Sequence, residues 1–281
     1  MTKQPPRESL MFDQALMLSE SVDAQTELLT VGRMPHRIAV VSGKGGVGKS
    51  NIVLNLGIAL ARDGARVLLV DGNVNLSNLD ILSGVSPKHK IVDVLDESVS
   101  LKDAITEIIP NVSLLAGSSD GRLNKLASND AVSLLQKIGS MKPAFHYLVI
   151  DTAGGIVQES ISLALLSDET FVVSTPEPTA VMDAYILVKV LKRINSSAHL
   201  KLVVNRAKSP EEAEEVRKKF DLVIEDLLKL RIDYAGFVPN DSSIEDAVNG
   251  QRPLLLRHPA SPAAASINSL ADQILSRKAN K

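Results

Sequence analysis

The feature that most constrains this chain is a glycine-rich loop that lies between apolar segments. Residues 43–50, Gly-Lys-Gly-Gly-Val-Gly-Lys-Ser, fit the pattern G-x-x-x-x-G-K-[ST] without a mismatch. Apolar residues 37–41 precede the loop, residues 52–60 follow it with apolar side chains at helical spacing, and residues 65–70 form another apolar run. A strand, a loop, a helix and a strand in this order predict a βαβ unit whose loop binds phosphate groups.

The combination of an apolar run and a polar end recurs along the chain. Further short apolar segments end in polar, Gly or Pro residues at 111–115, 147–150, 169–174, 200–204 and 233–238. Residues 209–227 start with Ser-Pro-Glu-Glu, a helix N-terminus signal. We therefore predict an α/β fold: a three-layer, mostly parallel sheet P-loop NTPase domain with helices on both faces. Residues 35–281 would form this domain, and residues 1–34 an N-terminal extension with a partner-binding helix.

Composition excludes several functional classes. The 281 residues contain no Cys, which excludes disulfides, thiolate metal sites and a Cys nucleophile. Aromatic residues make up 3%, too few for a base-stacking surface. The 31 Lys and Arg nearly balance the 33 Asp and Glu, so no strong nucleic-acid signal is present. No apolar run is long enough to cross a membrane, and residues 1–20 lack the apolar core of a secretory signal, so we expect a cytoplasmic protein.

The loop and two strand ends predict a nucleotide site with a metal ion. Lys49 is placed to reach the β- and γ-phosphates, and the Ser50 hydroxyl to ligate Mg²⁺. Asp71 and Asp151 each follow an apolar strand, which makes both candidates for holding Mg²⁺; the alternative is that they cap helices. The predicted phosphate-binding residues are Gly43, Lys44, Gly45, Gly46, Val47, Gly48, Lys49, Ser50 and Asn51.

A lysine directly after the first glycine of the loop is not part of an ordinary P-loop. The pattern K-G-G-x-G-K-[ST] around Lys44 resembles the deviant Walker A motif of the MinD/ParA group of ATPases. The resemblance implies a homodimer with ATP between the subunits, in which this lysine contacts the nucleotide of the partner subunit. A cation supplied in this way would neutralise charge on the transferred phosphoryl group. The alternative is a solvent-facing loop lysine.

The segment after Asp71 departs from the family pattern. Residues 71–80 resemble switch I of MinD-like proteins, but Asn73 stands where the family has the Asp that positions the attacking water. An amide orients water but does not accept its proton, so we expect slow ATP hydrolysis. The predicted catalytic residues are Lys44, Lys49, Asn73 and Asp151.

Two later strand ends resemble the family's base-binding segments. Asn205 stands at the position of the adenine-contacting Asn, followed by Arg206, and residues 238–241 match the loop that covers the base. An amide suits the donor and acceptor of adenine, and no guanine-type N-K-x-D pattern is found, so ATP and ADP are the expected ligands. The alternative is an Asn that serves as a turn residue. The remaining predicted residues are Val238, Pro239, Asn240 and Asp241.

Two further segments resemble the flagellar number regulators of this group, the FlhG/FleN type. Residues 175–185 look like their T-P-E-P-T-x-x-x-D-A-Y stretch, and residues 13–18 resemble the D-Q-A-x-x-L element that stimulates the GTPase FlhF. Its candidate partner-binding residues are Asp13, Gln14, Ala15 and Leu18; Ser19 replaces the family's Arg, and a packing helix is the alternative. The implied partners are FlhF, flagellar C-ring proteins or a transcription activator. The competing functions are a septum-positioning or DNA-partitioning ATPase and a nucleotide-binding module with negligible hydrolysis.

The C-terminal segment allows two interpretations. Ile267, Leu270, Ile274 and Leu275 recur at helical spacing, and three cations follow in residues 277–281. The favoured interpretation is a last core helix docked on the sheet. The alternative is an amphipathic helix at the inner face of the cell membrane, where the cations would contact anionic lipid.

Overall fold

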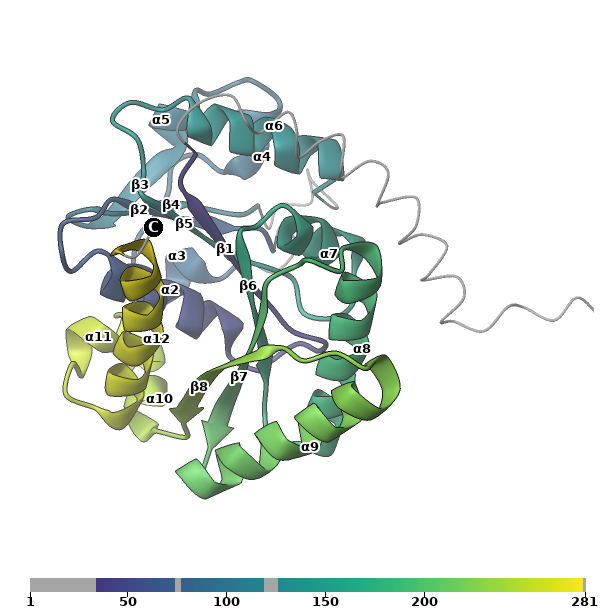
Figure 1. Cartoon of the computed structure of the whole chain (residues 1–281). Helices are drawn as coiled ribbons and strands as arrows, with labels where there is room; N and C mark the ends of the chain where they lie inside the picture. Colours follow the sequence, from purple (N-terminus) through teal and green to yellow (C-terminus); the bar gives the residue numbers. More distant parts are fainter. Residues whose placement is uncertain (1–33, 74–76, 119–125, 280–281) are drawn as a thin grey trace, which may run out of the picture.

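The computed structural model describes residues 34–73, 77–118 and 126–279. Its strands are β1 (His36–Val41), β2 (Val67–Asp71), β3 (Ile105–Ile109), β4 (Val112–Leu115), β5 (Tyr147–Asp151), β6 (Glu169–Ser174), β7 (Leu200–Ala207) and β8 (Asp233–Pro239). They form one eight-stranded sheet in the order β3-β4-β2-β5-β1-β6-β7-β8 (Figure 1). Neighbouring strands are parallel except β3 and β4, which are antiparallel.

The strands of the sheet centre are apolar on both faces because helices cover both faces. Every residue of β2 and of β5 is buried. The apolar runs that predicted strands all fall on observed strands. The edge strand β3 was not predicted, because its Ile-Thr-Glu-Ile-Ile sequence follows a short helix without a Gly or Pro between them and is only half-buried.

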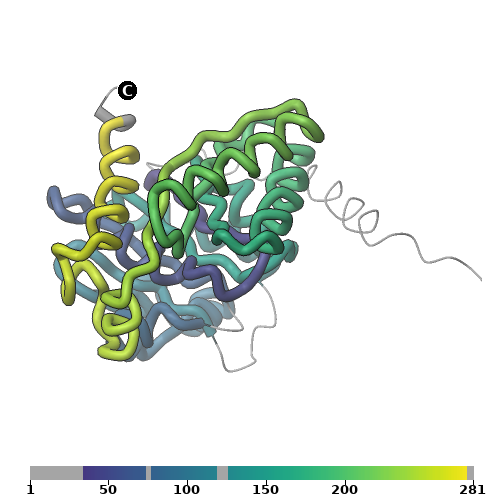
Figure 2. Tube along the Cα trace, turned by 90° about the horizontal axis from the view of Figure 1, so that it is seen from below, coloured from purple at the N-terminus to yellow at the C-terminus, as the bar shows by residue number. Residues whose placement is uncertain are grey.

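Helices cover the sheet on two sides (Figures 1 and 2). One side carries α2 (Lys49–Leu60), α10 (Ser242–Asn249), α11 (Leu254–Arg257) and α12 (Pro262–Ala279), with α3 (Leu79–Ser83) next to α2. The other side carries α4 (Ile91–Leu95), α5 (Leu101–Ala104), α6 (Ser128–Gly139), α7 (Gln158–Leu165), α8 (Pro178–Ile194) and α9 (Pro210–Leu228). The predicted three-layer α/β fold is confirmed.

The helix α12 belongs to the core. Ile267, Leu270 and Ile274 are buried in the same apolar cluster as α2, and the Gln273 amide donates a 2.7 Å hydrogen bond to the Ala235 carbonyl of β8. The helix α2 is itself buried on nearly all sides, because it lies between the sheet and α12. The favoured interpretation of the C-terminal segment is therefore confirmed.

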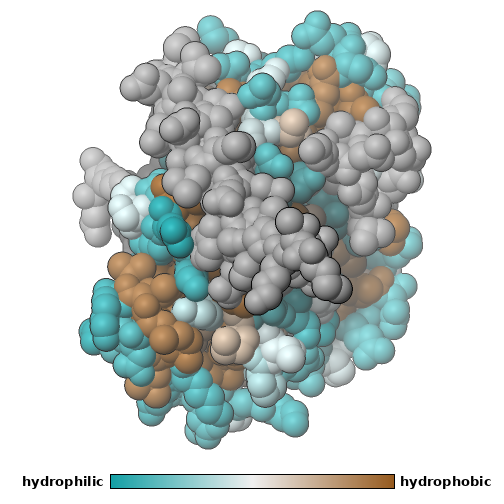
Figure 3. Space-filling view, turned by 90° about the vertical axis from the view of Figure 1, so that its right-hand side faces the viewer, coloured by the Kyte–Doolittle hydropathy of each residue, from teal (hydrophilic) through white to brown (hydrophobic). Residues whose placement is uncertain are grey.

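One side of the molecule shows polar side chains interspersed with local apolar patches. Figure 3 shows such patches on the side that carries α7, α8 and α9. On α8 and α9, the exposed large apolar side chains are Met182, Leu222 and Leu227. Among the described residues, no helix combines the length and the apolar character needed to cross a bilayer.

Candidate nucleotide-binding site

The phosphate-binding loop connects the C-terminal end of β1 with the N-terminus of α2. Gly46 and Gly48 have φ angles of 78° and 94°, a left-handed conformation that glycine adopts without strain. Gly43 is needed for a different reason: a Cβ atom there would lie 2.2 Å from the backbone of Asp183 in α8. The loop is thus shaped by its own backbone and by close packing against the start of α8.

The loop lysine Lys49 is held inside the site. Its side chain is buried, and its Nζ donates a 2.9 Å hydrogen bond to the Ser42 hydroxyl. Burial lowers the pKa of Lys49, and the nearby charge of Asp151 opposes that shift. This buried ammonium group beside the phosphate-binding loop is suited to bind an anion such as a phosphate group.

Asp71 and Asp151 end neighbouring strands and lie directly opposite each other in the β2–β5 register. Asp71 accepts hydrogen bonds from the Ser77 hydroxyl at 2.8 Å and from the backbone N–H groups of Asn73, Asn78 and Leu79. Burial raises the pKa of Asp71 to about 6, against these hydrogen bonds. Burial and the Asp71 charge raise the pKa of Asp151 to about 7, against a Ser50 hydrogen bond and the Lys49 charge.

These groups fit a divalent cation. Within the described residues, Asp151 Oδ1 is a buried oxygen without a hydrogen-bond partner. The Ser50 hydroxyl donates a hydrogen bond to the Asp151 carboxylate. One hydroxyl and two carboxylates therefore converge beside the phosphate-binding loop. Hard oxygen ligands of this kind suit Mg²⁺, and its charge would favour the ionised form of both carboxylates. The predicted set of Ser50, Asp71 and Asp151 is brought together.

The loops after β2 and β5 contact the site. The Asn73 backbone N–H donates to the Asp71 carboxylate at 3.1 Å, which holds the start of the loop after β2 next to Asp71. On the other strand, the Thr152 hydroxyl donates to the Val40 carbonyl at 2.9 Å. A Cβ atom at Gly154 would lie 2.5 Å from Gly45, so this loop packs against the phosphate-binding loop.

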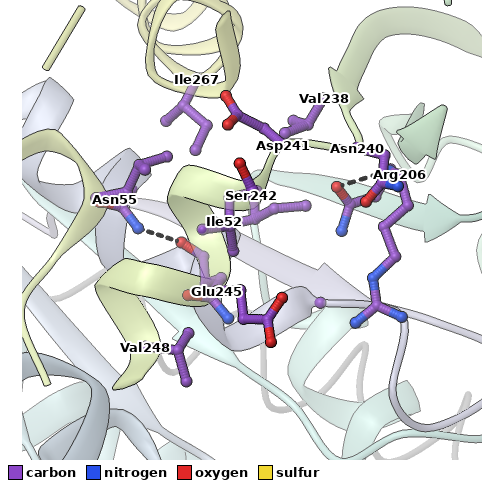
Figure 4. A pocket seen from close by; sticks show the side chains of 15 residues that line it. Ile52, Asn55, Arg206, Val238, Asn240, Asp241, Ser242, Glu245, Val248 and Ile267 are labelled. Atoms are coloured by element: carbon purple, nitrogen blue, oxygen red, sulfur yellow. Dashed lines mark hydrogen bonds between the residues drawn. The ribbon is translucent and has the colours of Figure 1, made fainter. Parts of the chain in front are cut away.

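A pocket of about 530 Å³ opens beside the phosphate-binding loop (Figure 4). Its lining includes most of the residues predicted for base recognition, namely Asn205, Arg206, Val238, Asn240 and Asp241, and also Gly48 and Asn51 of the predicted phosphate-binding segment; Pro239 is not among the lining residues. The sequence reasoning missed Ile52, Asn55, Ser242, Ile244, Glu245, Val248, Leu254 and Ile267. Their helical spacing was the only available signal, and it indicates a core rather than a pocket.

Several pocket residues are also used by the fold. Asn205 Nδ2 donates to the Val47 carbonyl at 2.6 Å, while Oδ1 accepts from the Arg206 N–H at 3.0 Å. Asp241 accepts from the N–H groups of Ser243 and Ala263 and so caps the starts of α10 and α12. The Asn55 side chain accepts from the Leu255 N–H at 3.0 Å. The Asn205 amide thus couples the pocket to the phosphate-binding loop.

Lys44 and the N-terminal residues complete the predicted site. Lys44 Nζ lies 2.5 Å from Glu177 Oε2, at the start of α8, and no hydrogen bond or ion pair joins it to Asp71 or Asp151 among the described residues. Glu177 was not predicted as a site residue, although it lies inside the Thr-Pro-Glu-Pro segment. Asp13, Gln14, Ala15 and Leu18 lie outside the described residues.

Comparison with known proteins identifies the family of the chain. The family model for the CobQ/CobB/MinD/ParA nucleotide binding domain matches residues 38–254, from β1 through both carboxylates to the start of α11. The chain belongs to this family. The matched range contains residues 43–50, and the predicted resemblance to the MinD/ParA group is confirmed.

Three relatives of this MinD/ParA-type protein show the range of the family. The antiactivator FleN of Pseudomonas aeruginosa is 33% identical over 84% of this chain and 85% of its own length. The flagellum site-determining protein YlxH of Helicobacter pylori is 30% identical over 85% of this chain and 82% of its own. The septum site-determining protein MinD of Pyrococcus horikoshii, solved with Mg-ADP, superposes with a TM-score of 0.69 at 27% identity, covering 86% and 96% of the two chains.

Proposed function

We propose that this MinD/ParA-type protein is an ATP-dependent switch that dimerises with ATP, hydrolyses it slowly, and regulates flagellar number or placement through partner proteins. The observation that carries the nucleotide part is the Asp71–Asp151 pair near Lys49, in which one oxygen of Asp151 has no hydrogen-bond partner among the described residues. The MinD relative solved with Mg-ADP supports ATP or ADP with Mg²⁺ as the ligand. The flagellar part is supported by the relatives FleN and YlxH.

Each group of residues has a task in this mechanism. The N–H groups of the phosphate-binding loop and the Lys49 ammonium bind the phosphates, and the pocket beside Asn205 receives the base. Mg²⁺, held by Ser50, Asp71 and Asp151, would supply charge neutralisation of the phosphates. Asn73 orients the water through hydrogen bonds and leaves proton removal without a carboxylate at that position. We therefore expect the site to bind ATP tightly and to hydrolyse it slowly.

Light scattering with ADP and with ATP tests the switch. We expect the protein to be a monomer with ADP and a dimer with ATP, and we expect Lys44→Ala to weaken the ATP dimer. Phosphate release measured on the same samples gives the rate of turnover. A dimer that forms equally well without Lys44 would remove the lysine from the subunit interface.

Asn73 favours a second candidate function. A nucleotide-binding module with negligible hydrolysis would dimerise with ATP but release no phosphate in multiple turnovers. Measured turnover therefore separates the two candidates. For the biological role, binding of FlhF-type GTPase, compared with binding to DNA and to anionic vesicles, separates the flagellar regulator from a partitioning or septum-positioning ATPase.

A further inference from the structure

The helix α10 brings one carboxylate to the pocket beside the phosphate-binding loop. Ser242, Glu245 and Val248 of this helix line the pocket, and their spacing of three residues places them on one face of α10. Figure 4 shows the Glu245 side chain extending from α10 toward the pocket. This face of α10 therefore forms a wall of the pocket, and Glu245 is the charged residue of that wall.

Other polar side chains of the pocket are used to hold its walls together. Asn205 donates to the Val47 carbonyl at 2.6 Å, and Asn55 accepts from the Leu255 N–H at 3.0 Å. Asp241 accepts from two backbone N–H groups at the starts of α10 and α12. These hydrogen bonds reduce the capacity that the three side chains have left for a ligand.

The Glu245 carboxylate differs from these groups. Within residues 34–73, 77–118 and 126–279, no hydrogen bond and no ion pair involves it. It lies in the first turn of α10, where the helix dipole favours a negative charge. That effect would be similar for an acid on the solvent side of the turn, so it does not account for a carboxylate that faces the pocket.

The chemistry of a carboxylate indicates which part of a nucleotide it can contact. An ionised carboxylate only accepts hydrogen bonds, so it needs an N–H or O–H donor. The phosphate oxygens are negatively charged acceptors and would repel it. The donors of an adenine nucleotide are the amino group of the base and the 2′ and 3′ hydroxyls of the ribose. All of them belong to the nucleoside part.

We propose that Glu245 is a specificity-determining residue that accepts a hydrogen bond from the nucleoside part of the bound nucleotide, at the adenine amino group or at a ribose hydroxyl. The inference rests on the proposed binding of ATP and ADP in this pocket. Glu245 lies outside Asn205, Arg206 and residues 238–241, the segments that the sequence indicated for base recognition. It gives the site a preference for nucleotides that carry the matching donor.

Calorimetric titration of the full chain with ADP and three analogues tests the proposal. Each analogue lacks one donor: 2′-deoxy-ADP, 3′-deoxy-ADP, and purine riboside diphosphate, which has no amino group. Diphosphates avoid both hydrolysis and the proposed ATP-dependent dimerisation. The variants are Glu245→Ala and Glu245→Gln. Asp226→Ala is the control, because it removes an exposed carboxylate from α9, on the other side of the sheet.

We expect the parent to bind one of the three analogues about five- to tenfold more weakly than ADP, as for the loss of a hydrogen bond to a charged group at an exposed site. Glu245→Ala should bind ADP more weakly by a similar factor and should distinguish that analogue from ADP by no more than about twofold. Glu245→Gln, which keeps one acceptor oxygen without the charge, should lie between them. Asp226→Ala should match the parent with all four nucleotides. The analogue that is affected identifies the donor as the amino group or as one of the hydroxyls.

The pattern across the analogues decides the proposal. Unchanged ADP affinity in Glu245→Ala would overturn it. So would a weaker ADP affinity with the analogue ratios of the parent, because a general effect on the fold or on charge weakens all four nucleotides alike. If the parent itself binds neither ADP nor ATP, the proposed function fails together with this inference, whereas normal ADP binding by both parent and Glu245→Ala removes this inference alone.

Discussion

At the scale of single residues, the glycines of the phosphate-binding loop differ in what surrounds them. A Cβ atom at Gly43 would lie 2.2 Å from the Asp183 backbone, whereas a Cβ atom at Gly45 would meet no atom within 4 Å. Gly43 allows the loop to approach α8, whereas a side chain at position 45 would point into open space.

We expect Gly43→Ala to lower the free energy of unfolding by about 1–3 kcal/mol, because backbone atoms cannot move aside as a flexible side chain does. Gly45→Ala should change it by less than about 0.5 kcal/mol. Urea unfolding followed by circular dichroism measures both. Equal losses for the two variants would contradict the packing role of Gly43.

Asn73 gives a second prediction at this scale. We expect Asn73→Asp to raise ATP turnover by roughly tenfold, because a carboxylate beside the Asp71–Asp151 pair can accept a proton from water. Phosphate release under multiple turnover is the measurement. Asn73→Ala, which lacks both amide and carboxylate, should be no faster than the parent; an Asp variant with parental turnover would refute our account of Asn73.

At the scale of elements, strands β6 and β7 carry an ion pair at the edge of the sheet opposite the nucleotide site. The buried side chains Glu169 and Lys201 approach to 2.5 Å. The His36 and His199 rings lie 3.8 Å and 3.7 Å from the same carboxylate, and Lys201 lies 5.4 Å from the centre of the Phe171 ring. Burial alone would raise the pKa of Glu169, but the hydrogen bonds and charges of His36 and Lys201 lower it to about 2.

This pair predicts a loss of stability in acid. The folded-state pKa of about 2 is below the ordinary value of 4.5, so the unfolded chain binds the proton more readily. The contribution of Glu169, roughly 3 kcal/mol, is complete above pH 4.5 and is lost as the pH falls toward 2. Urea unfolding at pH 7, 4 and 3 measures this change.

Variants separate the pair from general acid effects. Lys201→Met leaves a buried carboxylate without its cation and should cost about 3–5 kcal/mol at pH 7, whereas Glu169→Leu combined with Lys201→Met should be far closer to the parent. The double variant should also lose part of the pH dependence. A double variant as acid-sensitive as the parent would assign the effect to other carboxylates.

At the scale of the whole molecule, the parallel sheet gathers the site from distant parts of the chain. The phosphate-binding loop follows β1, Asp71 and Asp151 end β2 and β5, and Asn205 lies near the end of β7; the C-terminal ends of these parallel strands meet at one edge of the sheet. The helix α12 then adds Ile267 to the pocket wall from near the end of the chain. The site thus depends on the strands of the sheet and on α12.

Deletion of the N-terminal extension tests the predicted division of the chain into an ATPase domain, residues 35–281, and a partner-binding extension, residues 1–34. We expect removal of residues 1–30 to abolish binding to an FlhF-type GTPase and to leave ATP affinity within about twofold of the full chain. Calorimetric titration with ATP and a pull-down with FlhF measure the two effects. Unchanged FlhF binding would refute the assignment of Asp13, Gln14, Ala15 and Leu18 as partner contacts.

The sequence alone determined the fold class, the phosphate-binding loop and the two strand-end carboxylates. These features follow from local periodicity and from a loop in which spacing itself fixes the chemistry. Only the tertiary structure decided which groups meet across the chain: the Lys44–Glu177 pair, the Asn205 bond to Val47, and the walls of the base pocket. Helical spacing shows which side chains are buried, but the partner that buries them depends on how the elements pack.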